Sequence, residues 1–290
     1  MRVARRWRHV RSPLPLSRLH RRALTFDVGA HALPHPRKKS SGEDAHFLLS
    51  DALARRAALG VADGVGGAAD SAWYSAILMA NCESIIRADQ HAGPVDALQM
   101  AWGNARAEHA VDGRSTACVV LLDGSSDDAG PMLRAANLGD SGFWVLRRRA
   151  SGRLGVFFKS RPQVLSWNCP FQLGFLSGEE LNTPADAEMV ELPLQPGDAI
   201  VLATDGLFDI LYPLEILELV ETGLRQAQPA QELATSLVET AVERSKDPVR
   251  LSPVIEAMAR EGFVARPREA QDDVTVVVAQ ISDAAATPPS

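Results

Sequence analysis

The sequence predicts a single α+β domain. Segments with strand character occur in groups, and segments with helical periodicity occur in two separate blocks, so the strand–helix alternation of a doubly wound sheet is missing. The 290 residues include 46% hydrophobic and 23% charged residues, proportions that exclude a collagen, a coiled coil or a wholly disordered chain. No internal repeat, low-complexity block or long linker divides the chain, so we expect one core.

The first half of the chain predicts strands followed by two helices. Apolar runs that end in turn-forming residues such as D-G-V-G-G are typical of buried strands. Apolar residues at near-helical spacing predict the first helix, and Pro94 is suited to the first turn of the second. In order, we expect a short strand from residue 27, a loop to residue 42, strands at 45–49 and 57–62, and helices over 68–87 and 94–109.

The second half predicts more strands, a long loop, three helices and a last strand. The loop is expected over 159–187, where no period is clear, with Phe171 and Leu173 packing inward. The last strand is β-branched and reads as buried on both faces. The expected strands are 116–122, 132–138, 143–146, 156–158, 198–204 and 274–281, and the expected helices are 213–223, 229–246 and 252–261.

Charge divides the chain into a basic leader and an acidic body. Residues 1–26 contain eight arginines and no acid, and subtracting these from the net charge of −6 leaves −14 for the remaining residues. Arg-rich, acid-free N-termini with interspersed serines are typical of mitochondrial presequences, whereas a secretory signal needs a compact apolar segment that is missing here. We therefore expect a targeting leader over 1–26, a domain over 27–282 and a disordered tail over 283–290.

The leader also has a simpler interpretation as a solvated basic tail, and the chain would then be cytoplasmic. The three cysteines, Cys82, Cys118 and Cys169, form no close pair, which argues against a disulfide scaffold and suits a reducing compartment. No apolar run reaches the roughly 18 residues that a membrane span needs. Tryptophans in the body read as packing residues, and we expect no nucleic-acid partner.

Acidic residues stand at the ends of the expected strands. Glu43 and Asp44 precede a strand, Asp63-Gly64 follows one, and Asp140 lies in a tight turn between two more. Asp205-Gly206, with Asp209 four residues later, follows another strand, and Asp272-Asp273 precedes the last one. A single Asp-Gly pair most simply makes a turn. Five such sites at strand ends instead indicate carboxylates that converge around a cation, and oxygen ligands suit magnesium, manganese or calcium.

Six short motifs occur in a fixed order along the body. They are G-E-D-A-H (42–46), V-A-D-G-V-G-G (61–67), S-T-A-C (115–118), A-N-L-G-D-S-G (136–142), A-T-D-G-L-F-D (203–209) and D-D-V-T-V-V-V-A (272–279). Together they resemble the metal-dependent Ser/Thr protein phosphatases of type 2C, over about residues 42–281. The sequences D-G-V-G-G, L-G-D-S-G-F and P-F-Q-L are most similar to those of the PTC-seven-like branch, whose members are typically mitochondrial.

The resemblance implies a four-layer αββα sandwich of two antiparallel sheets flanked by helices, with two or three Mg²⁺ or Mn²⁺ ions at one end. It also implies that Asp63 bridges two ions, that the Gly64 carbonyl binds one of them, and that Asp205 and Asp272 bind the other. Phosphoserine or phosphothreonine of a protein substrate would be hydrolysed by a metal-activated water, without a covalent phosphoenzyme.

The resemblance assigns further residues around these ions. Glu43 and Asp44 would hold metal-bound waters, while Asp140 and Asp209 would serve a third ion. The arginine that usually precedes the glutamate by four residues is Lys39 here, a candidate phosphate contact that lacks the bidentate fork of arginine. A solvated loop is an equally good interpretation of this basic segment.

Val65 stands where many members of the family have a histidine, so the general acid for the leaving group is not identified. Two alternatives remain beside a monomeric protein phosphatase. One is a phosphomonoesterase that acts on small molecules, because metal chemistry does not specify the leaving group. The other is a non-catalytic phosphatase-like binding domain, whose expected signature is loss of Asp63, Asp205 or Asp272; all three are present.

Overall fold

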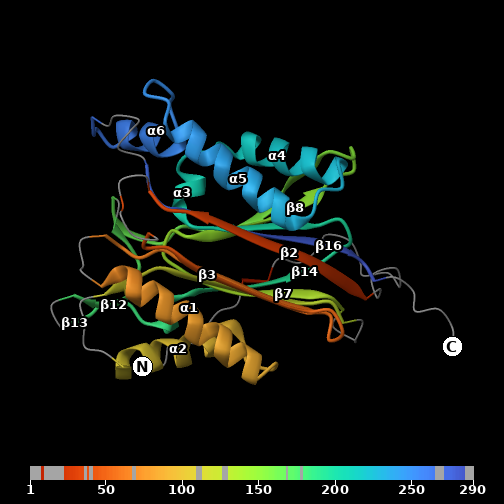
Figure 1. Cartoon of the computed structure of the whole chain (residues 1–290), viewed down its shortest axis with the longest axis horizontal. Coiled ribbons are helices and arrows are strands. Elements are labelled where there is room, and N and C mark those ends of the chain that lie inside the picture. Colours follow the sequence, from red (N-terminus) through yellow and green to blue (C-terminus); the bar gives the residue numbers. More distant parts are fainter. Residues whose placement is uncertain are drawn as a thin grey trace.

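Two β-sheets packed face to face form the centre of the molecule. The computed structural model describes residues 8–9, 23–35, 38, 42–66, 70–108, 113–125, 130–167, 169–176, 179–264 and 271–284. One helical pair lies on the outer face of each sheet, which gives four layers (Figure 1). The α+β class and the αββα sandwich are therefore confirmed.

The first sheet has six strands, all antiparallel except for one short parallel pair at its edge. That pair joins β1 to β14, the first strand after residues 159–187. In spatial order the strands are β1 (Arg8–His9), β14 (Glu188–Pro193), β7 (Met132–Leu138), β6 (Ala117–Asp123), β4 (Arg56–Ala62) and β3 (Ala45–Asp51).

The second sheet has five antiparallel strands, and the first and last long strands of the chain are neighbours in it. Their β-branched and small residues suit a sheet that is covered on both faces. In spatial order the strands are β2 (Leu24–Leu33), β16 (Val274–Asp283), β15 (Ala199–Ala203), β8 (Gly142–Arg148) and β9 (Leu154–Lys159).

The main core lies between the two sheets. Val61 and Val120 of the first sheet belong to the same buried cluster as Phe143, Leu202 and Val277 of the second. Because successive residues of a strand face opposite sides, the alternate residues of these strands form the outer interfaces with the helices. Strands β4 and β15 and most of β16 are thus buried on both faces, which is why their sequences read as nearly continuous apolar runs.

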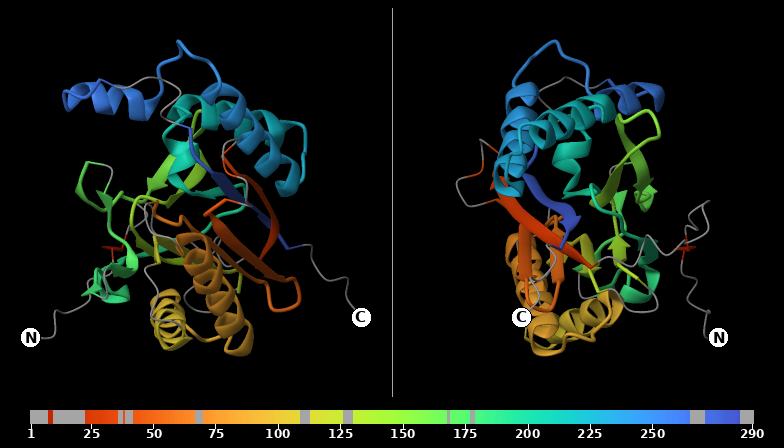
Figure 2. Two further views of the ribbon diagram at one scale, coloured as in Figure 1. Left: turned by 60° about the vertical axis from the view of Figure 1, so that its left-hand side comes forward. Right: turned by 90° about the vertical axis from the view of Figure 1, so that its right-hand side faces the viewer.

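The helices cover the outer faces of the sandwich. The helices α1 (Ser71–Ala88) and α2 (Pro94–Glu108) pack on the first sheet, and α4 (Pro213–Arg225) and α5 (Ala230–Ser245) pack on the second (Figures 1 and 2). A short helix, α3 (Asp205–Phe208), directly follows β15, and α6 (Pro253–Arg260) begins at the cap Ser252, whose hydroxyl accepts from the Ile255 N–H. Within the described residues, no helix is long and apolar enough to cross a bilayer.

The segment expected to be a loop over 159–187 contains several short strands, so that prediction was wrong in part. Each strand is too short to show a period in the sequence, and pairing with a distant partner stabilises it. Phe171 is half-buried and Leu173 is fully buried, which confirms their inward packing. The strands are β10 (Val164–Ser166), β11 (Cys169–Pro170), β12 (Leu173–Leu176) and β13 (Glu179–Glu180), with β12 also pairing with β5 (Arg114–Ser115).

The first long strand begins earlier than the sequence indicated. Strand β2 includes the last three residues of the leader expected over 1–26, and Leu24 is only 1% exposed in the main core. Its N–H donates to the Gly124 carbonyl, and its register partner is Asp283 at the end of β16. The pairing with β16 therefore extends the strand in both directions beyond the apolar core of its sequence.

Candidate active site

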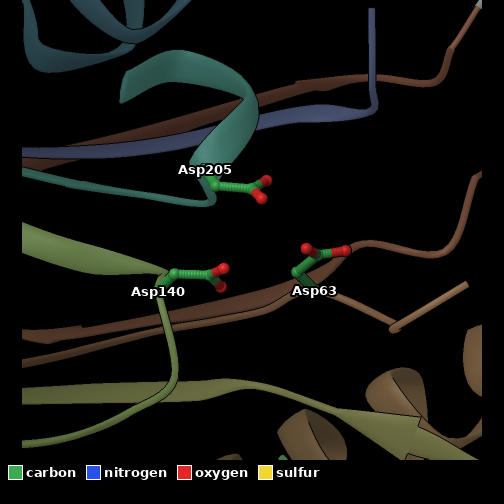
Figure 3. A group of neighbouring side chains, drawn as sticks. All are labelled: Asp63, Asp140 and Asp205. Atoms are coloured by element: carbon green, nitrogen blue, oxygen red, sulfur yellow. The ribbon is translucent and has the colours of Figure 1, made fainter. Parts of the chain in front are cut away.

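Three aspartates meet at one end of the sandwich. Asp63 follows β4, Asp140 lies in the turn between β7 and β8, and Asp205 begins α3 after β15. One carboxylate oxygen of each residue lies within 4.8 Å of the others, and Figure 3 shows the three side chains directed toward one another. The strand ends of both sheets thus bring together acids that are far apart in the sequence.

Three further aspartates surround this group. The charges of Asp44 and Asp272 raise the pKa values of both Asp63 and Asp205, and Asp209 adds to the repulsion on Asp205. Asp44 accepts a hydrogen bond from the Thr204 hydroxyl at 2.8 Å through one oxygen. The six aspartates (Asp44, Asp63, Asp140, Asp205, Asp209 and Asp272) are called the aspartate cluster below.

Burial and mutual repulsion disfavour the ionised cluster. Burial is the main cause that raises the pKa values of Asp63 and Asp205 well above the ordinary range, followed by repulsion from neighbouring aspartates. The pKa values of Asp44 and Asp209 rise to about 7 and that of Asp140 to about 6, again mainly through burial. A bound cation would remove this penalty, because it supplies the opposite charge that the cluster lacks.

The donor atoms of the cluster fit a hard divalent cation. One carboxylate oxygen of Asp44 and one of Asp140 are buried without a hydrogen-bond partner among the described residues. Buried polar atoms without partners are rare, and a bound ion is one way to satisfy them. Carboxylate oxygens are the ligands preferred by Mg²⁺, Mn²⁺ and Ca²⁺.

The turn at Asp63-Gly64 is fixed by backbone hydrogen bonds. The Asp63 N–H donates to the Thr116 hydroxyl at 3.0 Å, and the Asp63 carbonyl accepts from the Ser115 hydroxyl and the Thr116 N–H, each at 2.9 Å. The Gly64 N–H donates to the Glu43 carbonyl, and a Cβ on Gly64 would come within 2.7 Å of that same oxygen. Only glycine allows this close approach, so the two acidic segments are held together through their backbones.

Thr116 also links two of the aspartates that meet. Its hydroxyl lies 2.7 Å from the Ser141 hydroxyl, next to Asp140, while it accepts from the Asp63 N–H. Thr116 and Ser141 were not among the residues predicted for the site. Their positions inside the S-T-A-C and G-D-S-G motifs were the available signal, since hydroxyls beside a buried acid commonly hold its backbone.

Asp272 and Asp273 are adjacent but have different surroundings. Asp273 is 2% exposed and accepts from the N–H groups of His35 and Glu43, each at 2.6 Å. Burial alone would raise the pKa of Asp273, but these hydrogen bonds and Lys38 lower it. The Asp272 side chain is 49% exposed, and one of its oxygens accepts from the Asp273 N–H at 2.8 Å. Of the two, Asp272 is therefore the one available to a ligand.

The basic segment before Glu43 contributes Lys38. Its ammonium lies 2.5 Å from a Glu43 carboxylate oxygen, 2.8 Å from Asp273 and 3.7 Å from Asp272. Burial opposes its charge, yet the hydrogen bonds to Asp273 and Glu43 raise the pKa of Lys38 well above its ordinary value. The candidate Lys39 lies outside the described residues. The sequence spacing from Glu43 pointed to Lys39 and could not show that the Lys38 side chain is the one that contacts Glu43 and Asp273.

Val65 offers no group that could transfer a proton at the position where many relatives carry histidine. Its N–H donates to the Arg114 carbonyl at 2.9 Å, and its carbonyl accepts from the Ser71 hydroxyl at 2.7 Å. Those bonds use only backbone atoms. The position therefore helps to shape the turn after Gly64, and a proton for the leaving group must come from elsewhere.

Comparison with known sequences identifies a family. The profile of the stage II sporulation protein E (SpoIIE) family matches residues 54–282. The chain is 35% identical over 271 residues to "Probable protein phosphatase 2C 55" of Arabidopsis thaliana, and these cover 92% of the chain and 54% of the relative. It is 33% identical over 255 residues to "Protein phosphatase PTC7 homolog" of Homo sapiens, and this alignment covers 83% of the chain and 80% of the relative. The chain thus spans only about half the length of the plant relative.

Solved structures agree with this assignment. The X-ray structure of the photosystem II phosphatase PBCP aligns with a TM-score of 0.72 at 29% identity, over 88% of this chain and 98% of that chain. The catalytic domain of the serine/threonine phosphatase PstP, solved with two manganese ions, shares the fold with a TM-score of 0.59 at 20% identity, over 90% of this chain and all of that one. From its motifs, its fold and these relatives, the chain belongs to the type 2C protein phosphatase family.

Proposed function

We propose that this chain is a metal-dependent protein serine/threonine phosphatase. The observation that carries the proposal is the meeting of Asp63, Asp140 and Asp205, whose ligand oxygens lie within 4.8 Å of one another at the end of the sandwich. Relatives that match most of the chain are named protein phosphatase 2C and PTC7 homolog. Buried carboxylates that repel one another, as these do, favour metal-assisted hydrolysis over a nucleophilic side chain.

The proposed cofactor is Mg²⁺ or Mn²⁺, with two or three ions. The two manganese ions named for the PstP structure support a dinuclear site. Asp63, Asp205, Asp272 and the Gly64 carbonyl would hold the first two ions, and Asp140 with Asp209 would hold a third. When bound, such ions lower the pKa of coordinated water and neutralise the phosphoryl oxygens.

The protein's own groups would position these parts. Asp44 keeps one oxygen on the Thr204 hydroxyl and leaves the other without a partner among the described residues, which suits a hydrogen bond to coordinated water. Glu43 is paired with Lys38, so the lysine orients this carboxylate at the edge of the site. We propose that Lys39 remains the candidate phosphate contact, since it follows Lys38 in the same segment.

The proposed location is the mitochondrial matrix, supported by the Arg-rich composition of residues 1–26. The sequence predicts a leader over 1–26, but β2 already packs in the core at Leu24, so we propose that the leader ends before Leu24 and that the catalytic domain begins there. Imaging the tagged chain with and without residues 1–23 tests the location. A monomer is proposed for the domain, and light scattering after size exclusion tests it.

The decisive assay compares substrate classes. The full chain with Mn²⁺ should hydrolyse a phosphothreonine peptide with a higher kcat/KM than a panel of small phosphate esters, and EDTA should abolish the activity. A preference for a small ester would favour the phosphomonoesterase alternative. No hydrolysis of any substrate, with an intact fold, would favour a non-catalytic binding domain.

A further inference from the structure

A cavity of about 270 Å³ adjoins the aspartate cluster. Asp140, Asp205 and Asp209 form one part of its lining, and the remainder comes from α3, β8, β9, the segment around β10 and α6. The segment around β10 lies within residues 159–187, where the sequence predicted a loop. The metal-site resemblance gives no role to the residues of this cavity beyond the three aspartates.

Most of the remaining lining is aromatic or aliphatic. Trp144 stacks on Phe208 with ring centres 5.1 Å apart, and Trp167 stacks on Phe263, which follows α6, with centres 5.7 Å apart. Val254 donates its N–H to the Asp209 carbonyl at 3.2 Å, which ties the start of α6 to the cluster. The wall is thus held by contacts between elements and forms a preformed recess.

One cation lines this recess. Lys159 at the end of β9 is the register partner of Trp144, and its ammonium lies 4.8 Å from the centre of the Trp144 ring. Within the described residues it has no ion pair, whereas Lys38 and Lys246 are each paired with a carboxylate. Partial burial lowers the pKa of Lys159. The Lys159 side chain is exposed at the end of β9, so its ammonium is accessible to a carboxylate of a bound substrate.

We propose that this recess, called the Lys159 cavity, binds a substrate side chain near the phosphoresidue and that Lys159 selects an acidic one. The inference rests on the proposed function, because the phosphate must sit at the aspartate cluster. An extended peptide advances about 3.3 Å per residue, so a side chain one or two positions from the phosphoresidue reaches the adjoining recess. The substrate class is thus a phosphopeptide with glutamate or aspartate within two positions.

The aspartates in the lining do not oppose this selection in the metal-loaded protein, because bound cations neutralise their charge. A carboxylate in the recess would form a charge-assisted hydrogen bond with the ammonium. An apolar side chain at the same place would form no such bond. The walls contribute contact to the aliphatic part of the substrate side chain, and the charge determines which side chain is preferred.

The test compares phosphothreonine peptides that differ only in glutamate or glutamine within two positions of the phosphoresidue. The Mn²⁺-loaded full chain should favour the best-placed glutamate about three- to fivefold in kcat/KM, the range expected for an exposed ion pair, and added salt should reduce the preference. Lys159→Met should abolish it, Lys159→Arg should retain it, and Lys159→Glu should reverse it in favour of a lysine peptide.

Two controls separate the outcomes. The first control is p-nitrophenyl phosphate, which is too small to reach both the aspartate cluster and the Lys159 cavity, so its rate of hydrolysis should change less than about twofold in every variant. The second is Arg225→Met, which removes one exposed charge of α4 and should not affect the peptide preference. A wild-type chain that hydrolyses none of these phosphates would overturn the proposed function. Normal activity with no glutamate preference, or a preference that survives Lys159→Met, would overturn the role of the Lys159 cavity.

Discussion

The Asp273 carboxylate accepts a hydrogen bond of 2.6 Å from the backbone N–H of Glu43, a residue 230 positions earlier. The same carboxylate accepts from the His35 N–H and from the Lys38 ammonium. This single side chain therefore fixes the segment that carries Glu43 and Asp44 against the start of β16. Its neighbour Asp272 belongs to the aspartate cluster. Of these adjacent acids, Asp273 therefore has a structural role and Asp272 is available as a ligand.

Replacing Asp273 should cost mainly stability. Asp273→Ala leaves two backbone N–H groups and Lys38 without their acceptor, and we expect a loss of about 3 kcal/mol in the free energy of unfolding. Urea denaturation in EDTA measures this loss. The matched variant Asp272→Ala removes a half-exposed carboxylate and should change the stability by less than about 1 kcal/mol. Equal losses in both variants would contradict the separation of roles.

Asp63→Asn should lower the activity of the protein but raise the stability of its metal-free form. With Mn²⁺, the variant should hydrolyse p-nitrophenyl phosphate at least ~100-fold more slowly, because metal ions contribute several kcal/mol to such reactions. Without metal, it should unfold at a higher temperature than the wild type, since one buried repulsive charge is gone. Activity assays and thermal unfolding in EDTA test the two expectations. A wild-type rate, or a lower Tm in EDTA, would contradict them.

The stability of the metal-free protein should fall as the pH rises. Burial raises the folded-state pKa of Asp140 to about 6 and that of Asp209 to about 7, above the ordinary aspartate value of about 3.9, so the folded state binds more protons than the unfolded chain between these limits. Stability should therefore drop from about pH 4 to pH 7, by about 2 kcal/mol or more.

Urea midpoints in EDTA at several pH values measure this trend, and the same series with saturating Mg²⁺ is the control. Metal binding requires ionised ligands, so the ion should stabilise the protein more at pH 7.5 than at pH 5. An EDTA series in which stability rises with pH over this range would contradict the raised pKa values of these buried carboxylates.

A buried ion pair at the opposite end of the second sheet should affect stability without affecting chemistry. Arg147, 13% exposed, donates two hydrogen bonds of 2.7 and 2.6 Å to the fully buried Asp198 carboxylate. Asp198→Ala leaves the guanidinium without its partner and should cost about 3–5 kcal/mol. The double variant Arg147→Met/Asp198→Ala should lose less. Activity per folded molecule should match the wild type in both, and a selective loss of kcat would contradict this assignment.

Much of the fold could be predicted from local pattern. Strands such as 132–138 and helices such as 213–225 show their period in the sequence, because each is long and faces a continuous core. Strand β14 and the strands around Cys169 were missed, since they are short and depend on partners far along the chain. The start of β2 at Leu24 was also hidden, because pairing with β16 rather than composition determines it.

The candidate site was predictable to a similar degree. Acids beside glycines at strand ends identified Asp63, Asp140 and Asp205, and the structure brings these three together. Sequence spacing could not show that Lys38 contacts Glu43, because side-chain direction in an irregular loop depends on the fold. Nor could it reveal Lys159, whose position beside the cluster follows from the register of β8 with β9.

Calorimetric titration with Mn²⁺ shows whether the aspartate cluster binds divalent cations. The wild-type chain should bind at least two ions, and Asp63→Asn should lose the tightest binding while circular dichroism shows an unchanged fold. The absence of Mn²⁺ binding to the wild type, or an identical isotherm for Asp63→Asn, would show that the cluster is not a metal site.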